Sequence, residues 1–374
     1  MRVVVLHNLR AGGAHRRLEE QVRRLHVEVV EVCPSTALPV TDDPFVLSFR
    51  PAAPERARCF RPPLRYLDLF ALQVVWRRLA DAVTSLRPDV VFANPCQFLQ
   101  TPSALLALSA PTLYFCDEPR RVDYEPRATS GRNSLTRLPY APLHRAERLL
   151  DRRAVARATR LATNSRHSAT AIRAAYGREA EVLPMGVSAD FRPGNERPRH
   201  LLSVGTLIDD KGHELVLRAA ALTRRRWPVL VVAPRANDEA QARLERLARH
   251  VGVALSVRVA ISDAELVRAY RQAQATLYLA LREPFGLVAI EAQACGCPVI
   301  VSAEGGLPET LLPGVTGWAV PRDPAPAAVC VDELDRPETR ARMSCAAAAH
   351  GAGASWERSA SLLEDVLESV AHAR

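Results

Sequence analysis

The chain has 374 residues, of which 48% are hydrophobic and 24% charged; this predicts two globular domains, and no apolar run approaches the roughly 20 residues needed to cross a bilayer. The net charge of +9 is compatible with nucleic acid, anionic lipid or a phosphorylated ligand, but no helix-turn-helix, RNP-type aromatic pattern or zinc module supports nucleic acid. The eight cysteines are scattered without a C-x-x-C pair, so we expect reduced thiols. The N-terminus resembles a strand rather than a secretory signal. Together these features lead us to expect a cytoplasmic location.

Short β-branched runs alternate with amphipathic stretches through the first half of the chain. Strands are expected at 2–8, 26–32, 89–95, 112–117, 161–165 and 180–185. Helices are expected at 14–25, 66–86, 141–158 and 166–176. Strands that alternate with helices in this way predict βαβ units and a parallel sheet.

A segment rich in Gly, Pro, Asn and charge, 186–199, predicts an interdomain linker, after which the alternation restarts. Strands are expected at 200–207, 228–234, 255–260, 276–281 and 298–302. Helices are expected from about 213, at 238–250, after a capping box of Ser262 and Glu265, at 287–295 and at the C-terminus. Two similar halves predict a ligand cleft between them, at the carboxyl ends of the strands.

Lysine occurs once in the chain, at Lys211 in "SVGTLIDDKG". The preceding strand is expected to end at Gly205, and a helix follows Lys211-Gly212. A cation in a strand-to-helix loop is typical of a phosphate site, where lysine acts as a point charge. The alternative is a solvated lysine beside two aspartates, and the position of the only lysine favours the anion site.

The segment "LREPFGLVAIEAQACGCPVIV", 281–301, places Glu283 and Glu291 in an otherwise apolar run. A buried carboxylate is costly unless it has a partner, so we expect a partner for each. Glu283 is predicted in a loop at a strand end and Glu291 within the next helix. Gly286 would let a ligand approach the backbone, and the helix start offers N–H groups to an anion. Alternatively, Glu283 is a helix-start carboxylate and Glu291 half of a buried ion pair.

Two loops in the first half are weaker candidates. Gly12 and Gly13 follow the first strand and would border a phosphate or an acceptor, although many α/β proteins begin this way. Asp117 ends a strand and opens a loop rich in acids and arginines, 113–133, which either lines a polar pocket or is simply solvated. The chain lacks G-x-G-x-x-G, Walker A, D-x-D and G-x-S-x-G motifs. Their absence argues against dinucleotide binding, P-loop chemistry, a metal-clamping glycosyltransferase and an α/β-hydrolase.

Together these motifs resemble glycosyltransferase family 4, the retaining GT-B enzymes called glycosyl transferases group 1. The resemblance spans nearly the whole chain and is strongest from about 160 to 320. It is carried by 283–320, 203–212, 262–281 and 164–193. Its most specific part is the E-x7-E signature, "EPFGLVAIE", which runs from Glu283 to Glu291.

This resemblance implies an α/β fold of GT-B type, with two facing Rossmann-like domains and a cleft between them. Residues 1–190 would form the acceptor-side domain and 191–355 the nucleotide-sugar-binding domain. The final helix, 356–374, would pack back on the first domain. The implied reaction moves a hexose from a UDP- or GDP-linked sugar to an acceptor hydroxyl with retention, giving an α-glycosidic bond without a metal or other cofactor.

The resemblance also implies roles for individual residues in the second domain. Glu283 would lie at the donor sugar and Lys211 at the diphosphate, while Glu291 would bind the ribose hydroxyls. The backbone of Phe285, Gly286 and Leu287 would follow sugar and phosphate.

Further implied positions lie at other strand ends. Gly12 and Gly13 would border the phosphates from the first domain, and Gly205 would contribute to the donor site. Thr206 stands where the family usually has arginine, and Asp117 where many members have a histidine near the sugar and acceptor. These departures remove a cation at each place, although Asp117 would still orient a hydroxyl and is our third candidate catalytic residue, with Lys211 and Glu283.

Other functions remain open at this stage. An epimerase or a sugar phosphorylase of the same fold would share the donor site, and Thr206 and Asp117 are compatible with a catalytically weak binding protein. The acceptor would be a carbohydrate, a lipid-linked sugar or a small molecule. Arginine-rich stretches near 120–160 suggest peripheral contact with anionic lipid. The sequence fixes neither the donor nor the oligomeric state.

Overall fold

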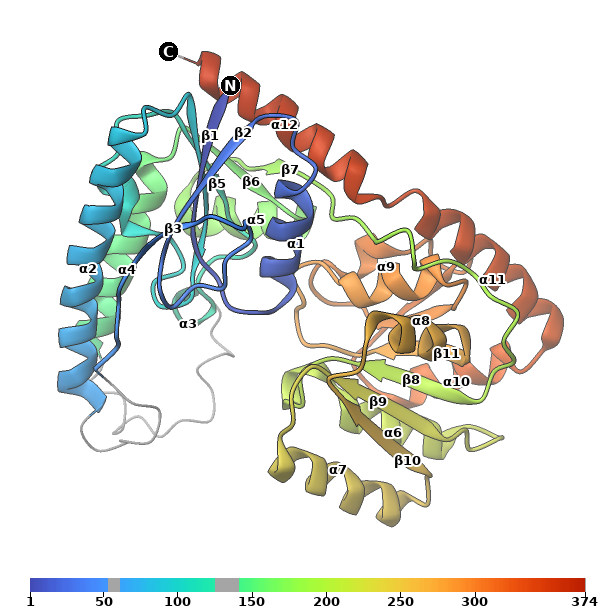
Figure 1. Cartoon of the computed structure of the whole chain (residues 1–374). Coiled ribbons are helices and arrows are strands. Elements are labelled where there is room, and N and C mark those ends of the chain that lie inside the picture. The colour runs from blue at the N-terminus through green and yellow to red at the C-terminus, as the bar shows by residue number, and fades with distance from the viewer. Residues whose placement is uncertain (53–60, 125–140, 374) are drawn as a thin grey trace. The chain divides into compact units, whose positions relative to one another are not determined.

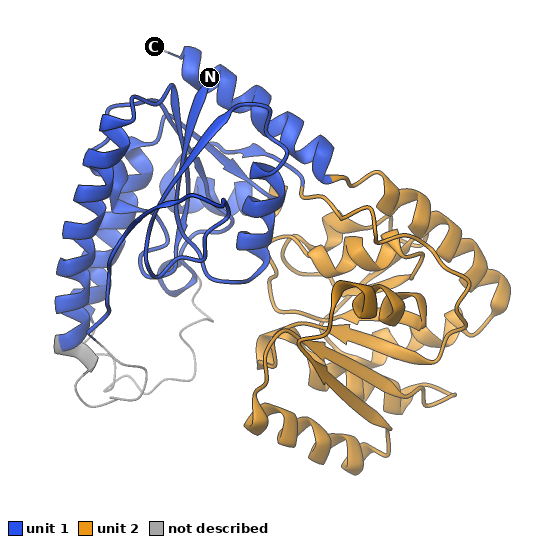
Figure 2. Cartoon of the chain, in the orientation of Figure 1, with its two compact units in different colours: residues 1–164, 168–184, 356–374 blue, residues 165–167, 185–355 orange. Residues whose placement is uncertain are grey.

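The computed structural model describes residues 1–52, 61–124 and 141–373, which form two compact units (Figure 2). Unit 1 comprises Met1–Asn164, Ser168–Pro184 and Trp356–Arg374; unit 2 comprises Ser165–His167 and Met185–Ser355. Each unit is an α/β fold around a parallel sheet, which confirms the predicted fold class. The boundary after Pro184 lies a few residues before the predicted one, and the C-terminal helix belongs to unit 1.

Unit 1 contains a sheet in the order β3-β2-β1-β4-β5-β6-β7, with every ladder parallel (Figure 1). Its strands are β1 (Arg2–Asn8), β2 (Glu28–Pro34), β3 (Phe45–Leu47), β4 (Val90–Cys96), β5 (Thr112–Phe115), β6 (Arg160–Thr163) and β7 (Glu181–Val182). Its helices are α1 (Gly13–Val22), α2 (Arg61–Ser85), the 3-10 turn η1 (Ser103–Leu106), α3 (Arg121–Tyr124), α4 (Ala141–Arg157), most of α5 (Arg166–Tyr176) and α12 (Trp356–His372).

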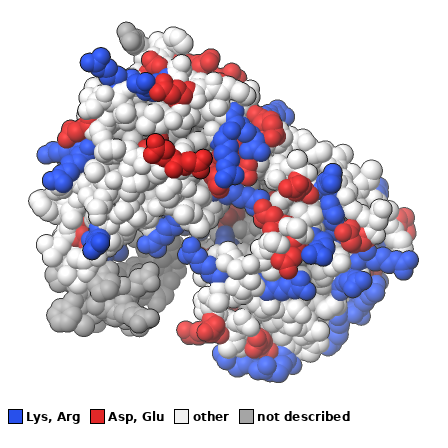
Figure 3. Space-filling view, viewed as in Figure 1, with Lys and Arg blue, Asp and Glu red and all other residues white. Residues whose placement is uncertain are grey.

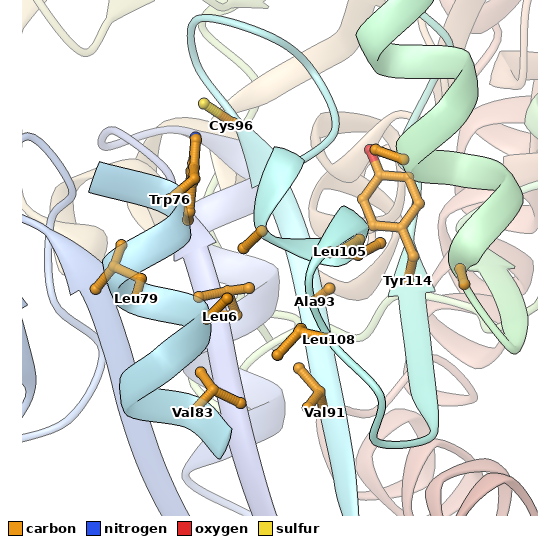
Figure 4. Packing of buried hydrophobic residues seen from close by; sticks show 14 of the residues in the cluster. Leu6, Trp76, Leu79, Val83, Val91, Ala93, Cys96, Leu105, Leu108 and Tyr114 are labelled. Atoms are coloured by element: carbon orange, nitrogen blue, oxygen red, sulfur yellow. The ribbon is translucent and has the colours of Figure 1, made fainter. Parts of the chain in front are cut away.

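The sheet of unit 1 is covered on both faces, which explains its uninterrupted apolar strands. Side chains alternate along a strand, so Val4 and Leu6 of β1 point to one face and Val3 and Val5 to the other. The first face packs against α2, η1 and α4, and Figure 4 shows Trp76 of α2 over this core. The second face packs against α1 and α12, which fixes the C-terminal helix on unit 1.

Unit 2 contains a parallel sheet in the order β10-β9-β8-β11-β12-β13. Its strands are β8 (His200–Val204), β9 (Val229–Ala233), β10 (Leu255–Val259), β11 (Ala273–Tyr278), β12 (Val299–Ser302) and β13 (Gly317–Val320). Its helices are η5 (Asp209–Lys211), α6 (His213–Leu222), α7 (Asp238–Val251), α8 (Asp263–Arg271), α9 (Leu287–Ala294), η6 (Leu307–Thr310), α10 (Pro324–Leu334) and α11 (Pro337–Ala352). Helices α6, α7 and α10 cover one face, while α8 and α9 cover the other.

Most predicted elements are present within a few residues of their expected bounds. The capping box is confirmed, since Ser262 Oγ accepts the Glu265 N–H and the Glu265 carboxylate accepts the Ser262 N–H. The sequence analysis did not predict β3, η1, α3 or β13. Residues 125–133 of the predicted acid- and arginine-rich loop lie outside the described residues. Among the described helices, none has both the length and the apolar character that spanning a membrane requires.

Candidate functional site

The loops that follow β8 and β11 lie side by side, because these strands are parallel neighbours in the sheet of unit 2. One loop carries Lys211 in η5, and the other carries Glu283. The structure brings them together: Lys211 Nζ lies 2.7 Å from Glu283 Oε2, and each side chain is only about one-fifth exposed, at 21% and 20%. Lys211 Nζ also donates to the Tyr278 hydroxyl at 3.1 Å. The only lysine of the chain is therefore held at the carboxyl edge of the sheet.

The two loops are also joined through their backbones. The Leu281 N–H donates to the Asp210 carbonyl at 2.7 Å. The guanidinium of Arg322, in the turn after β13, donates to the Leu279 carbonyl at 3.0 Å and to the Asp209 carbonyl at 2.9 Å. A Cβ on Gly212, where φ is +74°, would collide with the same Leu279 carbonyl. Arg322 and Gly212 thus fix η5 against the end of β11, which positions Lys211.

A buried histidine supports the turn at Gly205 and Thr206. His213 Nδ1 lies 2.8 Å from Ser203 Oγ, and its Nε2 lies 3.1 Å from the Thr206 carbonyl. Burial lowers the pKa of His213 to about 4, so the ring is neutral near pH 7. We assign the tautomer from these partners: Nε2–H donates to Thr206, and Nδ1 accepts from Ser203. The Thr206 side chain itself is exposed.

The segment after Glu283 leads directly into α9. Gly286 precedes the helix with φ of +118°, and a Cβ there would collide with the Leu307 side chain. Only glycine fits both constraints. No side chain caps the N-terminus of α9, so no cap covers the first N–H groups, near Leu287. Such a helix start favours an anion.

Glu291, the second glutamate of the motif, has a hydrogen-bond partner outside the Lys211–Glu283 pair. Its side chain is 5% exposed, and one carboxylate oxygen accepts a hydrogen bond of 2.9 Å from the hydroxyl of Tyr270 in α8. The sequence correctly predicts that a partner offsets the burial of this carboxylate. One partner of this carboxylate is thus the neutral hydroxyl of Tyr270.

In unit 1, Asp117 follows β5 and is held by a fully buried arginine. Arg17 of α1 donates from Nε and one Nη to the two carboxylate oxygens of Asp117, each at 3.2 Å. The guanidinium carbon of Arg17 lies 3.6 Å from the centre of the Phe115 ring, and Asn164 donates to Asp117 at 3.3 Å. This geometry gives Asp117 a structural role in unit 1 in addition to the predicted catalytic one.

Gly12 and Gly13 form the start of α1. Gly12 is extended, with φ of 162°, and a Cβ there would meet only the Arg10 carbonyl oxygen at 3.9 Å. Neither backbone strain nor local packing therefore requires glycine at position 12. A glycine at position 12 would also leave space for a ligand at this helix start. That explanation is compatible with the predicted contact with a phosphate.

One group of described side chains has the composition of a metal site: His7, Glu31 and Cys33, whose ligand atoms lie within 4.8 Å of one another. However, Glu31 already accepts hydrogen bonds from His7 Nε2 at 2.7 Å and from the N–H and hydroxyl of Thr41, both at 2.7 Å. Burial raises the pKa of the Cys33 thiol to about 12, which disfavours the thiolate that a metal needs. We interpret this group as a hydrogen-bonded polar core.

Comparison with known proteins gives a family match in the second half of the chain. Residues 189–349 match the family model described as "Glycosyl transferases group 1". Residues 189–349 therefore resemble a glycosyl transferases group 1 domain. This domain contains Lys211, Glu283 and Glu291, so the family resemblance of the sequence is confirmed where its motifs are most specific.

The chain is also similar in sequence to curated relatives and in fold to solved structures. D-inositol 3-phosphate glycosyltransferases of Frankia alni and Acidothermus cellulolyticus are each 36% identical, over 52% and 54% of this chain and 53% and 51% of their own lengths. The chain thus aligns with about half the length of these curated relatives. Sucrose-phosphate synthase of Thermosynechococcus elongatus matches all of both chains with a TM-score of 0.78 at 19% identity. Anabaena HepE in complex with UDP matches 99% of this chain and 100% of its own, with a TM-score of 0.74 at 16% identity. These structures share the fold.

Several residues that contact or support the Lys211 and Glu283 loops were not identified in the sequence analysis. Tyr278 ends a strand that was expected to be simply buried, and Arg322 contacts carbonyls 43 and 113 residues away, a distance at which no sequence pattern signals a contact. His213 directly follows Lys211-Gly212 at the helix start, which is a signal that could have drawn attention to it.

Proposed function

We propose that the chain is a retaining hexosyltransferase that uses a nucleoside diphosphate sugar, UDP- or GDP-linked, and an acceptor hydroxyl to form an α-glycosidic bond. The observation that carries this proposal is the ion pair of Lys211 and Glu283 at adjacent strand ends of the glycosyl transferases group 1 domain. The pair combines a cation suited to a diphosphate with a carboxylate suited to sugar hydroxyls. The names of the relatives and the UDP bound to HepE support the same chemistry.

In the proposed reaction the bond between the anomeric carbon and the diphosphate oxygen breaks, and negative charge builds up on the departing diphosphate. Lys211 and the N–H groups at the start of α9 would stabilise that charge, which is usually the largest contribution a protein makes to such a step. Because the chain has no D-x-D motif, we assign this task to the protein's own groups rather than to a metal. The acceptor hydroxyl would gain the sugar and lose its proton.

Glu283 would have two tasks in this scheme. Before donor binds, its carboxylate neutralises Lys211, which limits the cost of holding a lysine at a site that is mostly covered. When a diphosphate engages Lys211, the carboxylate is released to accept hydrogen bonds from the donor sugar. Glu291, with Tyr270 as its neighbour, would accept hydrogen bonds from the ribose.

Other roles in the proposal rest on the family resemblance. Gly12 and Gly13 would border the phosphates, and Asp117 would orient the acceptor hydroxyl while Arg17 fixes its carboxylate. We propose a cytoplasmic location, because the described cysteines are all free thiols. The acceptor is proposed to be a carbohydrate, a lipid-linked sugar or a small molecule.

The proposal is tested by thermal unfolding of the full chain with UDP-, GDP-, ADP- and dTDP-sugars, followed by product analysis with the one that binds. A ligand present at 100 times its dissociation constant stabilises the folded state by about 2.7 kcal/mol. A rise in melting temperature with one donor and an α-linked product are expected. An epimerised donor would indicate an epimerase, and a sugar 1-phosphate would indicate a sugar phosphorylase. An unchanged melting temperature with every nucleotide sugar would contradict the proposal.

A further inference from the structure

Helix α2 exposes an apolar face. The exposed fractions are 40% for Tyr66, 59% for Leu67, 71% for Phe70 and 41% for Val74. At about 100° per residue, these side chains and the exposed Arg77 and Arg78 fall within an arc of roughly 120° on one side of the helix. The opposite side, with Trp76, Leu79 and Val83, is buried against the sheet (Figure 4). A cluster of large apolar side chains in water indicates an interaction surface.

Helix α4 lies beside α2 in the same layer of unit 1 (Figure 1). Arg65 of α2 forms an ion pair with Glu147 of α4, with an N–O distance of 3.1 Å, and both helices pack into the same core. Their exposed sides therefore both look away from the sheet. The exposed side of α4 carries Leu149, which is 49% exposed, and four arginines. These are Arg145, Arg148, Arg152 and Arg153; Arg157, the last residue of α4, is also exposed but donates to the Leu108 carbonyl and is not counted here.

None of these four arginines, nor Arg77 or Arg78, forms an ion pair with a carboxylate among the described residues. The exposed sides of α2 and α4, which we call the α2/α4 face, thus hold six arginines against one exposed acid, Asp81. On the side seen in Figure 3, basic and acidic side chains are intermixed on both units.

We propose that the α2/α4 face binds an anionic lipid surface. Phe70 and Leu67 would enter the boundary between headgroups and acyl chains, and the arginines would bind lipid phosphates. Each basic residue near such a surface adds to the attraction. A second copy of the chain is a poorer occupant, because a two-fold contact through this face would bring the arginines of both copies together. The proposal does not depend on the proposed catalytic activity.

The test is flotation of the full chain with vesicles of phosphatidylcholine alone or mixed with phosphatidylglycerol. Binding is expected only to the mixed vesicles and is expected to weaken as salt is raised. The double variants Leu67→Gln/Phe70→Gln and Arg148→Gln/Arg152→Gln are each expected to lower the partition coefficient about tenfold or more. All four side chains are exposed, so these changes leave the core intact.

Matched controls in unit 2 separate this face from overall charge and overall hydrophobicity. Leu222→Gln/Val329→Gln removes two apolar side chains of similar exposure, and Arg246→Gln/Arg249→Gln removes two exposed arginines. Both controls are expected to bind vesicles like the wild type. Equal losses in control and test variants, or equal binding to neutral vesicles, would overturn the proposal. So would a wild-type dimer in sedimentation velocity that only the α2/α4 variants dissociate, without a change in flotation.

Discussion

Lys211 and Glu283 lie 72 residues apart in the sequence, and the structure joins their side chains at 2.7 Å. The pair means that Lys211 is neutralised before any anionic ligand arrives. A diphosphate that binds at this place competes with a carboxylate of the protein for the same ammonium group. Binding and turnover should therefore respond differently when the carboxylate is removed.

Glu283→Gln keeps the size of the side chain but removes its charge. We expect turnover to fall by a factor on the order of 100, the usual size of losing one polar group at a transition state. The affinity for a nucleoside diphosphate should stay the same or increase, because Lys211 loses its competing partner. Steady-state kinetics and calorimetry measure the two effects. An affinity that falls in parallel with turnover would show that Glu283 is needed for binding itself.

Arg322→Met removes the hydrogen bonds to the Leu279 and Asp209 carbonyls, which hold η5 against β11. We expect KM for the donor to rise by about tenfold, with a smaller change in kcat, because Lys211 loses its positioning but not its charge. Arg322→Lys, which reaches only one carbonyl, should be intermediate. Arg246→Met, at an exposed arginine far from these loops in sequence, is the matched control. Equal KM values for Arg322→Met and Arg246→Met would refute a positioning role.

The buried His213 predicts a pH dependence of stability. Its pKa is about 4 in the folded chain and 6.5 in the reference state, so the unfolded chain takes up the proton first as pH falls. Stability is complete above about pH 6.5 and is lost as pH falls toward 4, by up to about 3 kcal/mol. His213→Gln should lack this contribution, since an amide does not titrate. Urea unfolding at pH 7 and pH 4.5 compares the two, and identical pH slopes would rule out this assignment.

Asp117→Asn tests the structural role of the predicted catalytic carboxylate. Loss of its charge leaves the guanidinium of Arg17 buried without an anionic partner, and breaking such a pair costs about 3 kcal/mol. We expect a lower melting temperature as well as lower turnover. Circular dichroism and kinetics at a temperature where the variant is fully folded separate the two. Full stability with lost turnover would show that Asp117 acts only on the substrate.

The sequence predicts most of the fold because both sheets are buried on two faces. Residues such as Val3, Val4 and Val5 form uninterrupted β-branched runs, which only a doubly covered parallel strand explains well. The short β3 carries no such signal: Phe45 and Val46 are exposed at the sheet edge, so burial does not shape their sequence. Helix α2 begins at Arg61, several residues before the predicted start. The sequence misplaces this start because the exposed side of the helix is also apolar, which weakens the amphipathic pattern.

At the candidate site, local patterns drew attention to Lys211, Glu283 and Gly286, since each lies between a strand and the next α-helix. The contacts between them depend on strand order, which places β8 next to β11, and sequence does not state that order. Arg322 was missed for the same reason. Arg17 was missed because a helical arginine predicts a solvated side chain, whereas here it is fully buried between Asp117 and Phe115.

The central claim is that Lys211 meets the diphosphate of a nucleotide sugar, and the single lysine of this chain makes that claim directly measurable. An amine-reactive reagent can modify only Lys211 and the N-terminus, and mass spectrometry quantifies each site. We predict that the nucleoside diphosphate sugar that raises the melting temperature slows modification of Lys211 by about tenfold, as expected at ten times its dissociation constant, and leaves the N-terminus unaffected. Unchanged modification of Lys211 in the presence of a bound donor would contradict the account.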